Sequence, residues 1–167
     1  AASSRIGLPI IGQDPAMTLV FRQEYLKDTP QQPGRRILLP QEWLRDDYLP
    51  RHVPLDKPSN KQGTTYYFAA HCTEKTQLPG SDKDWQRIFQ HFGLDLQPVA
   101  VGCCGMAGTF GHESEHQAQS AQLFDMSWQA PVARYGEQLL ATGYSCRSQS
   151  KRMSGTVLQH PLQALLK

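Results

Sequence analysis

Three short stretches rich in β-branched, aromatic or aliphatic residues alternate with segments of helical periodicity, and this alternation constrains the fold most strongly. The sequences TTYYFAA, LQPVAVG and EQLLATG predict strands over residues 64–70, 96–102 and 137–143. Helical spacing or helix-start signals predict five helices, over residues 15–27, 40–49, 81–93, 112–128 and 160–167. Strands that alternate with helices form βαβ units, so we predict an α/β fold with a mainly parallel sheet and flanking helices.

Cysteines follow each of the three predicted strands. Cys72 follows the first strand, the adjacent pair Cys103 and Cys104 follows the second, and Cys146 follows the third. The carboxyl ends of strands in an open parallel sheet meet at the edge where ligands bind, so we expect the four thiols to converge there. Soft thiolates select zinc, copper(I) or iron–sulfur clusters. Four of them can complete a tetrahedral zinc site or hold a 4Fe–4S cluster.

The residues around the cysteines suit a negatively charged thiolate centre. The glycines of GCCG allow close backbone approach and direct N–H groups toward sulfur. A neighbouring lysine or arginine could lower a thiol pKa or offset the charge of a cluster, and a nearby histidine could tune it. The residues expected to surround the metal ligands are His71, Lys75, Gly102, Gly105, His112 and Arg147.

Length and charge bound the class of protein. With 167 residues, the chain is long enough for one domain with a core, and we expect residues 1–167 to form a single domain. The net charge of +2 is too small to indicate nucleic-acid binding, and no apolar run approaches the ~18 residues of a membrane span. No secretion signal is recognisable, and adjacent cysteines argue against a disulfide framework. We therefore expect a reducing, cytoplasmic location, with peripheral attachment at the inner membrane left open.

A rival motif overlaps the cysteine-rich loop. Residues 112–116 spell H-E-x-x-H, which in zinc peptidases places two histidines on one helical face beside a glutamate base. The residues that follow are polar, and no H-E-x-x-H-x-x-G-x-x-H extension is present. We therefore interpret this motif as the exposed start of the next helix rather than as a protease site.

Three segments together resemble a known family. In order, AAHCTEKT, VGCCGMAGTFGHE and LLATGYSCRSQ resemble the cysteine-rich CCG domain of heterodisulfide reductase subunits, glycolate oxidase iron–sulfur subunits and lactate-utilisation proteins. With the early segments IIGQDPAMTLVFRQEY and ILLPQEWL, the match extends over nearly the whole chain. In this fuller form it resembles the C-terminal end of bacterial FAD-linked oxidases of the D-lactate or D-2-hydroxyglutarate dehydrogenase type.

The resemblance implies a fragment of a larger flavoprotein that transfers electrons through an iron–sulfur cluster, most simply 4Fe–4S. It implies Cys72, Cys103, Cys104 and Cys146 as the ligands. FAD would bind elsewhere on the same longer chain, and the partners would be its flavin and ferredoxin-like domains and an electron acceptor. Two alternatives remain open: a zinc or thiol site with a structural or docking role, and thiol–disulfide chemistry by the vicinal Cys103 and Cys104.

Overall fold

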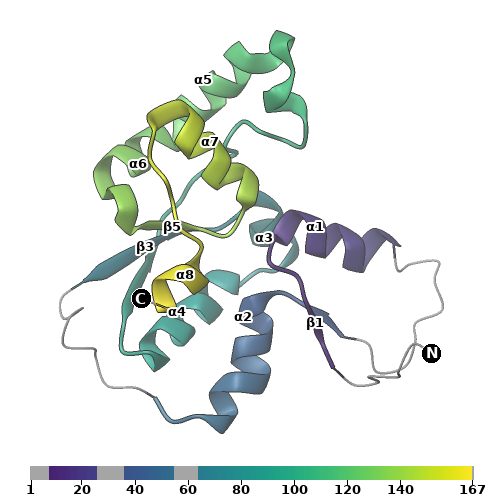
Figure 1. The fold of residues 1–167 in the computed structure, drawn as a ribbon, viewed down its shortest axis with the longest axis vertical. Coiled ribbons are helices and arrows are strands. Elements are labelled where there is room, and N and C mark those ends of the chain that lie inside the picture. Colours follow the sequence, from purple (N-terminus) through teal and green to yellow (C-terminus); the bar gives the residue numbers. More distant parts are fainter. Residues whose placement is uncertain (1–7, 26–35, 55–63, 167) are drawn as a thin grey trace.

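A three-stranded parallel sheet forms the centre of the computed structural model, which describes residues 8–25, 36–54 and 64–166 (Figure 1). The strands are β3 (Thr65–Ala69), β4 (Asp95–Pro98) and β5 (Leu139–Ala141). The strand order is β4-β3-β5, and Phe68 of the central strand pairs with Pro98 on one side and Leu140 on the other. The predicted α/β class, with a parallel sheet and flanking helices, is confirmed.

Helices cover both faces of this sheet because successive side chains of β3 point to opposite faces (Figure 1). Tyr67 and Ala69 pack in one apolar core, and Phe68 and Ala70 pack in the other. The helices on the first side are α5 (Gln117–Ser127), α6 (Gln129–Tyr135) and α7 (Tyr144–Ser154). Those on the second side are α2 (Pro40–Trp43), α4 (Ser81–His91) and α8 (Pro161–Leu165). The fold is thus a three-layer sandwich.

The N-terminal part adds a second, smaller sheet in which β1 (Ile10–Ile11) pairs in parallel with β2 (Ile37–Leu38). Helix α1 (Pro15–Val20) follows β1 and continues as a π-helical turn over Phe21–Tyr25. Asp14 caps the start of α1, since the Met17 N–H donates to Asp14 Oδ1 at 3.2 Å. Helix α1 lies against α3 (Cys72–Gln77), which brings the N-terminal part to the cysteine edge of the sheet.

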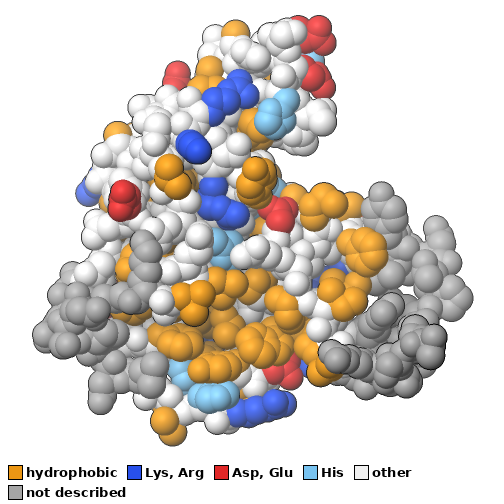
Figure 2. Space-filling view, in the orientation of Figure 1, with side chains coloured by type: hydrophobic (Ala, Val, Ile, Leu, Met, Phe, Trp, Pro, Cys, Tyr) orange, Lys and Arg blue, Asp and Glu red, His pale blue; other side chains and the backbone are white. Residues whose placement is uncertain are grey.

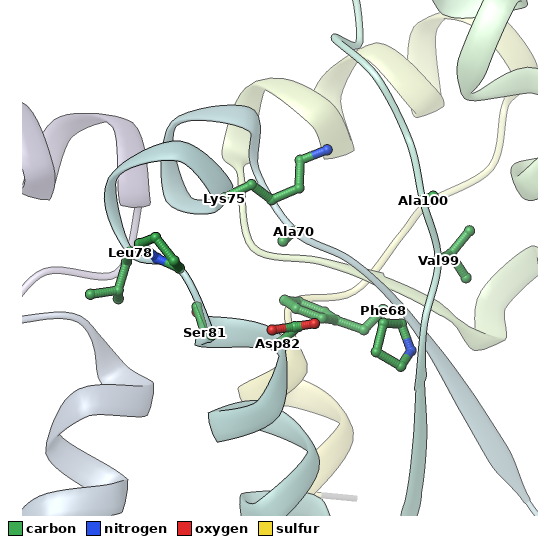
Figure 3. Close-up of a pocket in the computed structure, with 11 residues that line it drawn as sticks. Phe68, Ala70, Lys75, Leu78, Ser81, Asp82, Val99 and Ala100 are labelled. Carbon is green, nitrogen blue, oxygen red and sulfur yellow. The ribbon is translucent and has the colours of Figure 1, made fainter.

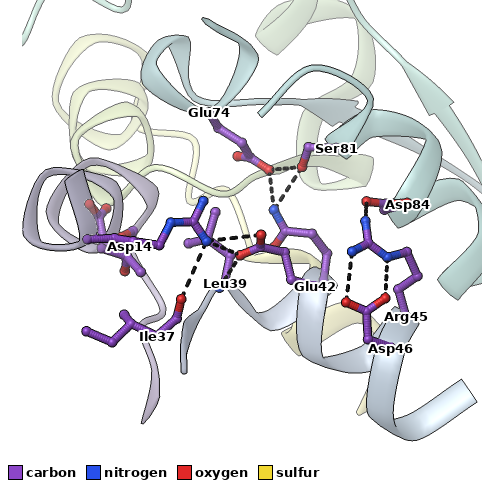
Figure 4. A network of polar contacts seen from close by, with 12 residues as sticks. Asp14, Ile37, Leu39, Glu42, Arg45, Asp46, Glu74, Ser81 and Asp84 are labelled. Atoms are coloured by element: carbon purple, nitrogen blue, oxygen red, sulfur yellow. Dashed lines mark hydrogen bonds and ion pairs between the residues drawn. The ribbon is translucent and has the colours of Figure 1, made fainter. Parts of the chain in front are cut away.

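Polar contacts tie this N-terminal part to α2 (Figure 4). Arg22 forms an ion pair with Glu42, with 2.8 Å between Nη1 and Oε2. The same carboxylate accepts the Leu39 N–H at 2.8 Å and so satisfies a backbone donor at the start of α2. After α2, the chain continues as a π-helical turn (Leu44–Tyr48) and a 3₁₀ turn (Leu49–Arg51). The predicted helix from Pro40 is therefore present, in a composite form.

Two predicted boundaries differ most from the structure. Strand β4 ends at Pro98 rather than at residue 102. Proline lacks the N–H that a strand ladder needs, so it favours the end of a strand. The helix expected over 112–128 begins only at Gln117, because Glu113 is extended, with φ −73° and ψ 131°. Residues 110–112 and 114–116 form two short 3₁₀ turns instead.

Several elements were not predicted, namely β1, β2, α3, α6 and α7. Helix α7 has the polar sequence YSCRSQSKRMS and buries Cys146, Gln149 and Ser150, so it has no apolar stripe that periodicity could detect. The three prolines and the glycine of residues 50–64 predict a loop. Most of that segment, together with residues 26 and 27 of the first predicted helix, lies outside the described residues. Within residues 8–25, 36–54 and 64–166, no helix has the length and apolar character that crossing a membrane would require.

Candidate thiolate site

A cavity of about 440 Å³ lies where the loops after the three central strands meet. The chain runs from β3 to β4 on one side and then crosses to β5 on the other, so the C-terminal ends of β3 and β5 form a topological switch point. Such switch points are the usual ligand sites of open α/β sheets. The cavity is lined by Asp14, Ala16, Met17, His71, Cys72, Thr73, Cys103, Cys104, Ala107, Gly108, Tyr144 and Ser145.

Three of the four cysteines therefore line one cavity, and the fourth lies directly behind it. Cys72 is exposed, Cys103 is half-buried, and Cys104 and Cys146 are buried. Cys72 is the first residue of α3, whereas Cys146 lies in the first turn of α7, five residues beyond the end of β5. All four thiols are free.

Cys104 and Cys146 form a coupled pair of thiols. A hydrogen bond from Cys146 lowers the pKa of Cys104 to about 6, with a further contribution from the Met106 N–H. The same hydrogen bond to Cys104, together with burial, raises the pKa of Cys146 well above its ordinary value. Of the two thiols, Cys104, which lines the cavity, is therefore the one that ionises first.

His71 directs a hydrogen-bond donor at the cavity. Its Nδ1 accepts the Thr73 N–H at 3.2 Å, so the proton of a neutral ring is assigned to Nε2. Nε2 lies 4.0 Å from Cys72 Sγ and 3.4 Å from Ser145 Oγ. The hydrogen bond from His71 lowers the pKa of the Cys72 thiol. Burial opposes the charged ring, but the interaction with Cys72 outweighs it and raises the pKa of His71. His71 thus stabilises a thiolate as a donor rather than serving as a ligand.

Backbone geometry accounts for the glycines of the Cys103–Cys104 loop. The Gly105 N–H donates to Cys103 Sγ at 3.4 Å. Gly105 has φ +93°, and a Cβ there would lie 2.2 Å from the Ser120 carbonyl oxygen, so only glycine fits. Burial raises the pKa of Cys103, in contrast to that of Cys104. The Gly102 carbonyl accepts the Trp128 Nε1–H at 3.1 Å, which fixes the loop against the end of α5.

Lys75 and Arg147, the two cations expected near the thiols, donate hydrogen bonds to backbone carbonyls of the cysteine-bearing segments. Lys75 Nζ donates to the Val101 carbonyl, just before the paired cysteines. Arg147 Nη1 donates to the carbonyls of Ala141 and Thr142 at 2.8 and 2.7 Å, at the end of β5. Both side chains therefore position cysteine-bearing loops, and their hydrogen bonds go to backbone oxygens instead of sulfur.

His112 is exposed and does not line the thiol cavity. Because residues 112–116 are not one α-helix, the two histidines of H-E-x-x-H do not share a helical face. Among the described residues, the one group of at least three potential metal ligands whose atoms lie within 4.8 Å of one another is Glu113, Glu115 and His116, at the surface. No three of the four cysteine sulfurs lie within 4.8 Å of one another.

Sequence reasoning missed Glu74, which is fully buried two residues after Cys72. Its carboxylate accepts hydrogen bonds from Gln41, at 2.9 Å, and from Ser81 (Figure 4). Its other oxygen accepts a hydrogen bond from Thr142, whose hydroxyl oxygen accepts the His71 N–H at 3.2 Å. Glu74 therefore joins the loop before Cys72 to the loop before Cys146. Neither the position of Glu74 in the sequence nor the residues around it indicate that it joins these two loops.

Asp14 and Gly143 are two further site residues that the sequence did not mark. Asp14 lines the cavity, and its Oδ2 accepts the Tyr144 N–H at 2.8 Å across 130 positions of sequence. A Cβ on Gly143 would lie 2.3 Å from His71 Cδ2 and 3.1 Å from Cys146 Sγ. The absence of a side chain at this position lets His71 and Cys146 approach each other.

A second cavity, of about 490 Å³, lies between β3, β4 and the turn from α3 to α4 (Figure 3). Phe68, Ala70, Val99 and Ala100 line its sheet side, and no cysteine lines it. Figure 3 shows the Lys75 amine directed away from the other labelled side chains.

Comparison with known proteins gives a consistent set of relatives, although no family model matches the sequence. The chain is 48% identical over 160 residues to a D-2-hydroxyglutarate dehydrogenase of Pseudomonas putida, which covers 96% of this chain. It is 43% identical over 165 residues to the enzyme of that name from Escherichia coli, and 42% identical over 172 residues to that from Haemophilus influenzae, each covering 98% of the chain. The chain spans only 15–16% of the length of these relatives.

The fold and the site define a class: an α/β domain in which three cysteines line a cavity at the switch point of a parallel sheet. Within that class, the chain is similar to one segment of the D-2-hydroxyglutarate dehydrogenases. This similarity supports the resemblance to that type of dehydrogenase noted in the sequence. More than four-fifths of the length of each relative lies outside the matched segment.

Proposed function

We propose that this chain is the iron–sulfur electron-transfer module of an FAD-linked 2-hydroxyacid dehydrogenase of the D-2-hydroxyglutarate or D-lactate class. One observation carries the proposal: Cys72, Cys103 and Cys104 line a single cavity, with Cys146 hydrogen-bonded to Cys104 behind them. In the chain, the four cysteines follow the three strands of the central sheet, two of them within the helices α3 and α7. The dehydrogenase context comes from the names of the relatives.

The residues around the cavity suit a bound anionic cluster. Cys72 and Cys104 have lowered pKa values, so both thiols ionise more readily than an ordinary cysteine. The Gly105 N–H and the His71 ring are donors to sulfur, and such donors stabilise thiolate ligands. A 4Fe–4S cluster bound by the four cysteines would supply reversible one-electron storage. The protein would supply the donors, the buried environment and the positions of the loops.

The spacing of the thiols favours a cluster over a single zinc ion. Four sulfurs at about 2.3 Å from one zinc ion lie about 3.8 Å from one another in a tetrahedron. Among the described residues, no three of the cysteine sulfurs fall within 4.8 Å of one another. In a 4Fe–4S cluster each thiolate binds a different iron, so the sulfurs do not have to meet at one point.

Vicinal dithiol chemistry by Cys103 and Cys104 is also less favoured than cluster binding. The interaction that most affects Cys104 is with Cys146, and burial raises the pKa of Cys103. A pair in which one thiol is poorly ionised attacks a disulfide slowly from that side. The adjacent cysteines are better explained as two ligands presented by one glycine loop.

Anaerobic reconstitution with iron and sulfide tests the proposal. The chain should gain a broad absorbance in the visible range and, after reduction, an EPR signal. Replacing any one of Cys72, Cys103, Cys104 or Cys146 with serine should reduce iron binding, whereas His112→Ala should leave it unchanged because His112 does not line the cavity. Failure to bind iron, both in this chain and in the longer protein purified without oxygen, would overturn the proposal.

A further inference from the structure

Ser145 places a hydroxyl group at the wall of the thiol cavity. It is the second residue of α7, directly before Cys146, and its half-buried side chain lines the cavity. Figure 2 shows the surface hollowed between the regions of α1 and α7, and residues of both helices line the cavity. Ser145 therefore adjoins the space in which the proposed cluster would bind.

The hydroxyl of Ser145 has different partners from the other hydroxyls of α7. Ser150 Oγ donates to the Thr156 carbonyl at 3.1 Å, and Ser154 Oγ donates to a backbone carbonyl at 2.8 Å. Within the described residues, the Ser145 hydroxyl donates to no backbone carbonyl, and its Oγ lies 3.4 Å from His71 Nε2. Because His71 Nδ1 accepts a backbone N–H, its Nε2 carries the ring proton and donates to Ser145 Oγ. The proton of the Ser145 hydroxyl thus remains available for sulfur.

Two buried thiols are the acceptors within reach of this hydroxyl. Cys104 and Cys146 have 4% and 2% of their surface exposed. The hydrogen bond from Cys146 has the largest effect in lowering the pKa of Cys104, and a hydrogen bond from Ser145 lowers it further. The hydrogen bond to Cys104 and burial raise the pKa of Cys146, and a hydrogen bond from Ser145 opposes that rise. One hydroxyl therefore contacts both members of the pair.

Metal binding would change the hydrogen bonding of this pair. A cysteine that binds a metal is deprotonated, so ligation by Cys146 would remove the proton that it donates to Cys104. Two thiolates would then lie close together in a buried environment. Ser145 would supply a side-chain hydrogen bond to the pair that does not depend on the Cys146 proton. Hydrogen bonds to sulfur are among the determinants of the reduction potential of an iron–sulfur cluster.

We propose that the Ser145 hydroxyl donates to the thiolate pair of Cys104 and Cys146 and thereby raises the reduction potential of the cluster. The ring of His71 holds the hydroxyl in this direction. This inference rests on the proposed function and concerns the same site. An added electron increases the negative charge on the sulfurs, so a donor stabilises the reduced form more than the oxidised form. Removing the hydroxyl therefore makes reduction less favourable.

A redox titration of the longer protein, purified without oxygen and followed by EPR, tests this role of Ser145. The signal of this cluster is the one that is absent when Cys104 and Cys146 are both replaced with serine. Ser145→Ala should make reduction about three- to tenfold less favourable, with iron content unchanged, which lowers the midpoint potential by about 30–60 mV for one electron. Ser148→Ala is the matched control and should leave the potential unchanged, because Ser148 is a half-buried serine of α7 that does not line the cavity.

A second pair of variants separates the hydroxyl from the packing around it. Threonine and valine have nearly the same shape and differ by the hydroxyl. Ser145→Thr should therefore have a higher potential than Ser145→Val, by the same three- to tenfold factor in the equilibrium of reduction, about 30–60 mV. Equal potentials in these two variants, or loss of iron in both variants that lack the hydroxyl, would overturn the inference and leave the cluster proposal intact. Absence of iron and of the EPR signal from the unchanged protein would instead overturn the proposed function.

Discussion

Replacing Glu74 tests whether one buried carboxylate holds the two sides of the thiol site together. Glu74 has no exposed surface and accepts hydrogen bonds from Gln41, Ser81 and Thr142, which belong to three other segments. Glu74→Ala would leave those buried donors without their acceptor. Each orphaned buried donor costs about 1–3 kcal/mol, and Glu74→Ala orphans three of them. We therefore expect Glu74→Ala to lower the free energy of unfolding by about 3–5 kcal/mol.

Glu74→Gln separates the shape of this network from its charge. The amide keeps the volume and one acceptor oxygen, and burial already raises the pKa of Glu74 and so disfavours its charged form. We expect a loss of about 1–2 kcal/mol, since only one acceptor becomes a donor. Urea unfolding of the 167-residue chain, followed by circular dichroism, gives both values. The control is Glu113→Ala, which removes an exposed carboxylate and should change stability by less than about 0.5 kcal/mol. A loss below about 1 kcal/mol for Glu74→Ala would refute the reasoning.

Three further changes test other parts of the account. Gly143→Ala should reduce iron binding in the reconstitution assay and cost about 1–3 kcal/mol in urea unfolding, because the new Cβ would overlap His71 and crowd Cys146; full iron binding would contradict the close packing. Burial lowers the pKa of His160 to about 4. The unfolded chain therefore takes up this proton at a higher pH than the folded chain, so the free energy of unfolding should fall as the pH falls. The loss should reach about 3 kcal/mol between pH 6.5 and 4. His160→Asn keeps a capping oxygen and should flatten this pH dependence of stability. An unchanged dependence in that variant would contradict the assignment to His160. His112→Ala should leave the free energy of unfolding within about 0.5 kcal/mol of the unchanged chain, because His112 is exposed; a larger loss would show a structural role.

The sheet and its cysteines were predictable because strand propensity is strong in TTYYFAA and because loops after parallel strands meet at one edge. That rule alone placed Cys72, Cys103 and Cys104 around one cavity. The position of Cys146 was less predictable, since it lies within α7, a helix whose buried residues are polar. Hydrophobic periodicity cannot detect a helix that buries glutamine and serine.

The residues that position the cysteine-bearing segments could not be predicted, because their partners lie far away in the sequence. Glu74 acts through partners that are 33 and 68 positions away in the chain, and Asp14 through one that is 130 positions away. No local pattern encodes such contacts. Periodicity also found the apolar stripe of α1 but gave no indication that Met17, Val20 and Phe21 face outward.

The content of iron, acid-labile sulfide and zinc in the longer protein, purified without oxygen, tests the central claim most directly. The account predicts that the segment corresponding to this chain contributes about four iron and four sulfide, and that this contribution is lost when Cys104 and Cys146 are both replaced with serine. One zinc ion with no iron attributable to these cysteines would contradict it.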